Sequence, residues 1–131
     1  MADEERIPLA TNATRCEEVL LVEDEPTILS LLELGLAQLG FRVTPCRDAS
    51  QALALITAAP ERFAVIVTDF DLPGFSGLEL ADRVRAAAPH VRIVLHSGSC
   101  SPLAAEGRVD AIVPKPARIR DLSSVIRGLL E

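Results

Sequence analysis

The sequence alternates between short apolar runs and segments with helical periodicity, and it does so five times. The apolar runs, which predict strands, cover residues 18–22, 41–46, 63–68, 91–96 and 110–114. Helical segments follow them, and Gly or Pro residues stand at the ends of several. Repeated strand–helix alternation predicts a parallel sheet with helices on both faces. A chain of 131 residues suits one such domain.

Composition excludes several classes of function. The net charge of −6 argues against a nucleic-acid partner. The longest apolar runs fall far short of the roughly 20 residues that a membrane span needs. Residues 1–16 are polar and lack the apolar core of a signal peptide, so we expect a disordered lead-in there and the domain over 17–131.

The cysteines indicate a reducing compartment. Cys16, Cys46 and Cys100 are odd in number, and their spacing matches no metal or redox motif. They are typical of reduced thiols, which predicts a cytoplasmic protein.

Polar side chains follow the predicted strands at the point where each strand ends. Glu23 and Asp24 follow the first strand, Asp69 the third, Ser97 the fourth and Lys115 the fifth. In an open parallel sheet these ends lie at one edge, where ligands bind. Clustered carboxylates repel unless a cation joins them, and oxygen ligands suit Mg²⁺. Together with a hydroxyl and an ammonium group, such a site suits a phosphoryl group.

Four motifs in order carry a family resemblance: LLVEDEP, VIVTDFDLPGFSG, IVLHSGS and VPKP. With them the sequence resembles the receiver domains of bacterial response regulators, over about residues 18–130. The resemblance implies a flavodoxin-like, doubly wound α/β fold with a five-stranded parallel sheet in the order 2-1-3-4-5. It also implies a signalling module rather than an enzyme.

The resemblance implies a role for each acid. Asp69 would be the phosphoacceptor, taking a phosphoryl group from a histidine kinase or a histidine phosphotransfer protein. Asp24 and Asp69 would bind Mg²⁺ directly, and Glu23 through water. Asp71 would contribute its backbone carbonyl to the metal.

The remaining motif residues would hold the phosphoryl group. Ser97 would donate a hydrogen bond to it, assisted by the N–H of Gly98. Lys115 would pair with a phosphoryl oxygen. The peptide bond between Lys115 and Pro116 is a candidate for the cis form, which the family often uses to direct this lysine.

The sequence departs from the family between Ser97 and Lys115. That interval is 18 residues, about four fewer than usual, which is roughly one helical turn. We therefore expect a shortened fourth helix, little more than a turn around residues 103–106. Ile112 stands where the family commonly has Tyr, Phe or His.

An enzymatic alternative comes from the pair Asp69 and Asp71. An Asp-x-Asp sequence after an apolar strand also resembles haloacid-dehalogenase-like phosphatases, with Asp69 as the nucleophile. The order of motifs disfavours it, because the acidic pair Glu23-Asp24 precedes the lysine instead of following it.

His96 could suggest a catalytic Ser–His pair with Ser97. Adjacent strand residues point to opposite faces, however, so we expect no catalytic role for His96. The sequence leaves open a stand-alone receiver or one domain of a hybrid kinase.

Overall fold

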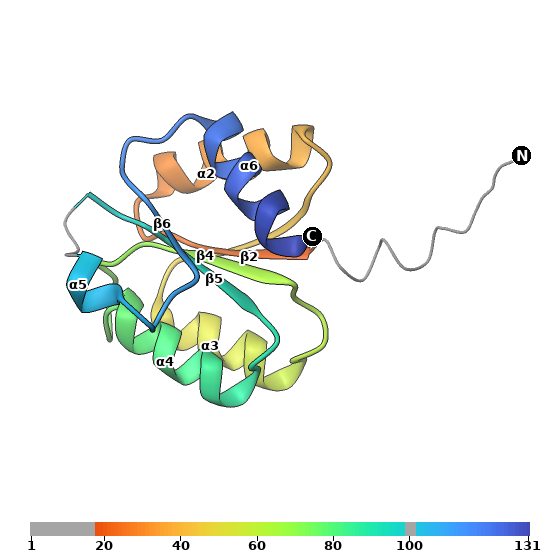
Figure 1. Ribbon diagram of the computed structural model, residues 1–131. Helices are drawn as coiled ribbons and strands as arrows, with labels where there is room; N and C mark the ends of the chain where they lie inside the picture. Colours follow the sequence, from red (N-terminus) through yellow and green to blue (C-terminus); the bar gives the residue numbers. More distant parts are fainter. Residues whose placement is uncertain (1–17, 99–101) are drawn as a thin grey trace, which may run out of the picture.

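The computed structural model describes residues 18–98 and 102–131, which form a five-stranded parallel sheet between helices (Figure 1). The strands are β2 (Glu18–Val22), β3 (Arg42–Cys46), β4 (Val65–Thr68), β5 (Arg92–His96) and β6 (Ala111–Val113). They lie in the order β3-β2-β4-β5-β6. Because β2 is the first strand along the chain, this order confirms the predicted order 2-1-3-4-5. The chain reverses its direction of winding between β2 and β4, so a ligand crevice is expected beyond the carboxyl ends of these two strands.

Helices cover both faces of the sheet. They are α2 (Pro26–Gln38), α3 (Ala49–Ala58), α4 (Gly77–Ala87), α5 (Pro102–Ala105) and α6 (Ile119–Leu130). Figure 1 shows α2 and α6 on one face, and α3 and α4 on the other. The short α5 lies at the side of the sheet. This is the doubly wound arrangement that the strand–helix alternation predicts.

The core is divided by the sheet into two layers. Successive strand residues point to opposite faces, so each strand feeds both layers. One layer lies under α2 and α6 and includes Val19, Leu21, Val65, Val67 and Val94. The other lies under α3 and α4 and includes Leu20, Val22, Ile66, Phe63 and Ile93. The middle strands are therefore mostly apolar, as is usual for parallel strands covered on both faces.

Side chains cap the first turns of three helices. Glu25 caps α2, Asp48 caps α3 and Ser76 caps α4, each accepting a backbone N–H bond, at 2.9, 2.7 and 3.2 Å respectively. The cap at Glu25 starts α2 directly after the acidic pair at the end of β2.

The helix α5 has four residues, which confirms the predicted shortening. Two ion pairs tie the segment between α5 and β6 to α4. Arg108 Nη2 lies 2.8 Å from Asp82 Oδ2, and Arg85 Nη2 lies 3.3 Å from Asp110 Oδ2. The segment is thus fixed to its neighbour by charge as well as by apolar contact.

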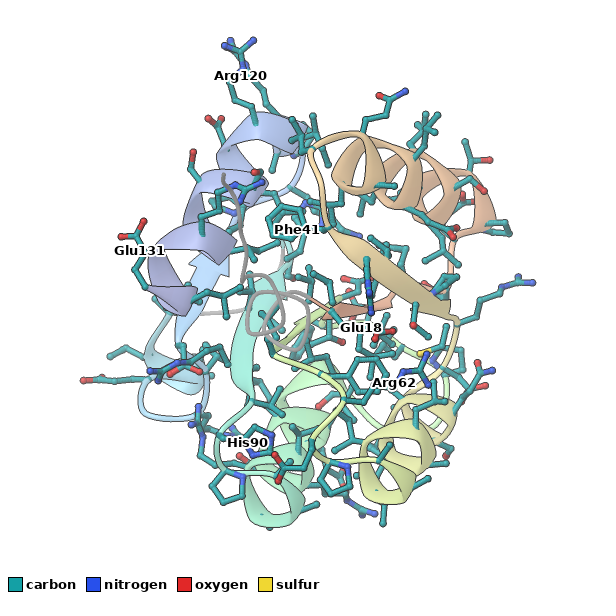
Figure 2. The ribbon with its side chains drawn as sticks, turned by 90° about the vertical axis from the view of Figure 1, so that its right-hand side faces the viewer. Glu18, Phe41, Arg62, His90, Arg120 and Glu131 are labelled. Atoms are coloured by element: carbon teal, nitrogen blue, oxygen red, sulfur yellow. The ribbon has the colours of Figure 1, made fainter. Side chains whose placement is uncertain are left out.

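The amino end of the sheet is fixed by a polar contact. Figure 2 shows Glu18, the first described residue, beside Arg62, whose Nη2 lies 3.1 Å from Glu18 Oε2. The predicted lead-in over 1–16 lies outside the described residues. Strand β4 begins at Val65, two residues later than predicted, after the buried Phe63. In the described part of the chain, no helix is both long and apolar enough to cross a bilayer.

Candidate functional site

The functional side chains lie at the carboxyl edge of the sheet because four parallel strands end there. Glu23 follows β2, Asp69 follows β4, Ser97 follows β5, and Lys115 stands two residues beyond β6. The registers pair Val22 with Thr68, so the residues that follow these two are neighbours. The sheet thus brings together residues that are up to 92 positions apart in the sequence.

Three of the predicted acids form one cluster. Glu23, Asp24 and Asp69 each offer a carboxylate oxygen, and these oxygens lie within 4.8 Å of one another. Glu23 and Asp69 are buried, whereas Asp24 is exposed. A set of carboxylate oxygens open to water on one side is the kind of donor set that Mg²⁺ prefers. The residues present therefore fit a magnesium site.

Lys115 bridges two of these acids. Its Nζ lies 3.0 Å from Glu23 Oε1 and 3.2 Å from Asp69 Oδ2. Burial alone would lower the pKa of Lys115, but the hydrogen bond to Glu23 and the charges of Asp69 and Glu23 outweigh burial and raise that pKa above its usual value. The ammonium group therefore stays charged. The peptide bond between Lys115 and Pro116 is cis.

The backbone holds Asp69 firmly. Its N–H donates to the carbonyl of Val22 at 3.0 Å, and its Oδ1 accepts from the N–H of Phe70 at 2.8 Å. The hydroxyl of Thr68 donates to the Asp69 carbonyl at 2.9 Å. One carboxylate oxygen is thus held by the backbone, while the other faces Lys115.

Glu23 has both carboxylate oxygens engaged. Oε1 faces Lys115, and Oε2 accepts from the N–H of Glu25 at 3.2 Å. Only 2% of Glu23 is exposed. The side chain thus has less capacity to bind a cation directly than the exposed Asp24.

Gly77 is a residue whose role the sequence reasoning missed. Its N–H donates to the carbonyl of Phe70 at 2.8 Å, at the start of α4. A Cβ added at this position would collide with the backbone carbonyl of Asp69, closer than side chains approach. Only glycine allows α4 to begin this near to Asp69. The sequence feature that could have indicated this role is the second glycine of GFSG, which is Gly77.

The structure places the remaining predicted residues at the same edge. Ser97 is buried, and the backbone pairs it with β6, since its N–H donates to Val113 and its carbonyl accepts from Lys115, at 3.1 and 3.3 Å. Asp71 is exposed, and its side chain is not part of the acidic cluster. The predicted metal ligand of Asp71 is its backbone carbonyl, and this role stays a prediction.

Comparison with known proteins identifies the family. The sequence profile named "Response regulator receiver domain" matches residues 19–127. The chain is 30% identical over 111 residues to the two-component response regulator ARR2 of Arabidopsis thaliana, covering 82% of this chain and 17% of that protein. It is 31% identical over 119 residues to the probable transcriptional regulatory protein TcrX of Mycobacterium tuberculosis, covering 86% of this chain and 49% of that protein. The chain thus spans less than half of these relatives.

Comparison with solved structures supports the same family. A CheY-like receiver domain protein from Methanospirillum hungatei superposes with a TM-score of 0.80 at 27% identity, covering 87% of this chain and 93% of that one. The regulator TrrA from Thermotoga maritima, solved in complex with Mg²⁺ and BeF, superposes with a TM-score of 0.78 at 26% identity, covering 86% and 98%. The phosphatase alternative is wrong, because the matched family is one of signalling modules rather than enzymes. The chain belongs to the response regulator receiver domain family.

Proposed function

We propose that this receiver domain accepts a phosphoryl group on Asp69 from the phosphohistidine of a histidine kinase or a histidine phosphotransfer protein. The observation that carries the proposal is the position of Asp69. Its carboxylate joins the acidic cluster and lies 3.2 Å from the Lys115 ammonium group. In the transfer, a carboxylate oxygen of Asp69 forms a bond to phosphorus, the bond from phosphorus to the donor nitrogen breaks, and imidazole leaves.

Magnesium would be held by four groups of this chain. Asp24 and Asp69 would bind it through carboxylate oxygens, Asp71 through its backbone carbonyl, and Glu23 through water. The engagement of both Glu23 oxygens by Lys115 and Glu25 supports a water-bridged role for Glu23. When bound, the ion would supply positive charge that offsets the repulsion between the carboxylates and the incoming phosphoryl group.

The chain's own donors would stabilise the phosphorylated state. Lys115 would exchange its contact with Asp69 for a phosphoryl oxygen, since its raised pKa keeps it a charged donor. Ser97 and the N–H of Gly98, which follow β5 at the same edge, would donate hydrogen bonds to the other oxygens. These donors lie on different strands, so phosphorylation would draw the ends of β5 and β6 toward β4.

The domain would signal by docking to another protein. We place it in the cytoplasm, where a kinase could reach it, and we expect no nucleic-acid contact from a chain with a net charge of −6. The downstream target would recognise the changed edge of the sheet.

The experiment is phosphorylation by a small donor. With Mg²⁺ and acetyl phosphate, the wild-type protein should gain one phosphoryl group, measured as an added 80 Da by intact mass. Asp69→Asn should gain none. Asp71→Asn is the matched control, because it makes the same change two residues away and keeps its backbone carbonyl, so it should still be labelled. Equal labelling of the Asp69 variant would refute the assignment.

A further inference from the structure

A cleft of about 510 Å³ opens at the carboxyl edge of the sheet, where ligands of open parallel sheets bind. Its lining residues are Asp24, Arg47, Asp48, Gln51 and Pro73. Asp24 belongs both to this cleft and to the acidic cluster with Asp69. The cleft therefore adjoins the place where a phosphodonor would meet Asp69.

The position of Arg47 follows from the pairing of the strands. Val22, the last residue of β2, pairs with Cys46 on one side and with Thr68 on the other. The residues that follow these two partners are Arg47 and Asp69. The end of β2 thus lies between the residue that would attack the phosphoryl group and a cation.

The backbone of Arg47 is held, whereas its guanidinium is not. The N–H of Arg47 donates to Gln51 Oε1 at 3.3 Å, and the N–H of Gln51 donates to Asp48 Oδ1 at 2.7 Å. Arg47 is exposed, and within residues 18–98 and 102–131 its guanidinium forms no hydrogen bond and no ion pair. Two acids line the same cleft, yet neither holds it. The guanidinium is therefore available to a ligand.

The chemistry of a guanidinium selects the part of a donor that it suits. Its parallel N–H groups match the two oxygens of a carboxylate or of a phosphate. In the proposed phosphorylated state, the phosphoryl oxygens already have the magnesium ion, Lys115, Ser97 and the N–H of Gly98 as partners. Arg47 is left for the other half of the donor, which is the leaving group.

We propose that Arg47 makes this domain selective for acyl phosphates among small phosphodonors, by binding the carboxylate that leaves. The inference rests on the proposed transfer to Asp69 and adds the class of small donor. A carboxylate oxygen of Asp69 forms a bond to phosphorus, and the bond from phosphorus to the acyl oxygen breaks. The acyl group leaves as a carboxylate with that electron pair, and its two oxygens accept from the guanidinium. Asp24 and Asp48 in the same cleft would repel the free product, which favours its release.

The test compares two kinds of leaving group. Acetyl phosphate and carbamoyl phosphate release anions, acetate and carbamate, whereas phosphoramidate releases neutral ammonia. Arg47→Ala should lower the second-order rate constant for labelling by acetyl phosphate about tenfold, because it removes a hydrogen-bonded charge from the leaving group. Carbamoyl phosphate should lose about as much. Labelling by phosphoramidate should stay within about twofold of the wild-type rate, measured by intact mass over time with Mg²⁺.

Arg42→Ala is the matched control. Arg42 is the first residue of β3 and Arg47 follows the last, so the two variants remove the same exposed charge at opposite ends of one strand. Arg42→Ala should leave all three rates within about twofold, since exposed changes away from the site have small effects. Arg47→Lys should recover only part of the acetyl phosphate rate, because one ammonium group cannot form the paired hydrogen bonds of a guanidinium.

The outcomes separate this inference from the proposed function. If Asp69 of the wild-type protein is labelled but Arg47→Ala loses nothing with acyl phosphates, the inference fails alone. It also fails alone if Arg47→Ala slows phosphoramidate as much as acetyl phosphate, because general attraction of anions would then explain the loss. A wild-type protein that no donor labels at Asp69 would overturn both.

Discussion

The acidic cluster should destabilise the metal-free protein, and Asp24 is the acid that tests this most cleanly. It is exposed, so replacing it disturbs little packing, whereas Glu23 and Asp69 are buried. Unit charges 4.8 Å apart repel by about 0.9 kcal/mol in the dielectric of water. Two such neighbours give about 1.7 kcal/mol, of which the Lys115 charge offsets roughly half. A net repulsion of about 1 kcal/mol therefore acts on Asp24.

Asp24→Asn should accordingly stabilise the protein when EDTA is present. We expect the free energy of unfolding to rise by about 1 kcal/mol and the Tm by roughly 4 °C for a domain of this size, measured by thermal denaturation at low salt. Glu61→Gln is the control. It removes one negative charge from an exposed residue that precedes β4, near the opposite end of the sheet, and should change stability by less than about 0.5 kcal/mol.

Magnesium should make the wild-type protein more stable than Asp24→Asn, the reverse of the order in EDTA. At ten times its Kd, a ligand of the folded state stabilises by about 1.4 kcal/mol. The wild-type protein should gain this amount and Asp24→Asn should gain much less, because a direct ligand is missing. A fall in Tm for Asp24→Asn in EDTA, or an equal rise for Glu61→Gln, would refute the repulsion argument. An equal gain from Mg²⁺ in both proteins would refute the assignment of Asp24 as a ligand.

Two further predictions concern packing. Gly77→Ala should destabilise the protein by more than about 2 kcal/mol in urea unfolding, because its Cβ meets the Asp69 carbonyl. Gly128→Ala should cost nothing, because a Cβ there meets no other element of the described structure within 4 Å. Similar losses for both variants would contradict the contact at Gly77. Burial, assisted by the charge of Asp48, raises the pKa of Cys46 to about 12, so iodoacetamide at pH 8 should leave Cys46 unmodified in the folded protein and alkylate it after denaturation. Peptide mapping would follow the modification of Cys46. Equal rates of alkylation in the folded and the denatured protein would contradict the burial of its thiol.

Local sequence patterns determined the elements of this fold. Apolar runs and helical periodicity depend on neighbours within a few residues, and the apolar runs placed the ends of every described strand to within about two residues. The shortness of α5 followed from the spacing between Ser97 and Lys115. The acids were predictable as well, because strand ends in a parallel sheet share one edge. The family's motifs added the order of the strands.

Contacts between distant side chains were decided only by the tertiary structure. The two ion pairs of Lys115 depend on strand register and on the path of the chain beyond β6, which no local pattern encodes. The close approach of Gly77 to Asp69 depends on where α4 begins in space. Arg47 shows the difference most clearly. In the sequence it is an arginine outside the family's motifs, and it shares a cleft with Asp24 only because β3 pairs with β2 in a register that brings their carboxyl ends together.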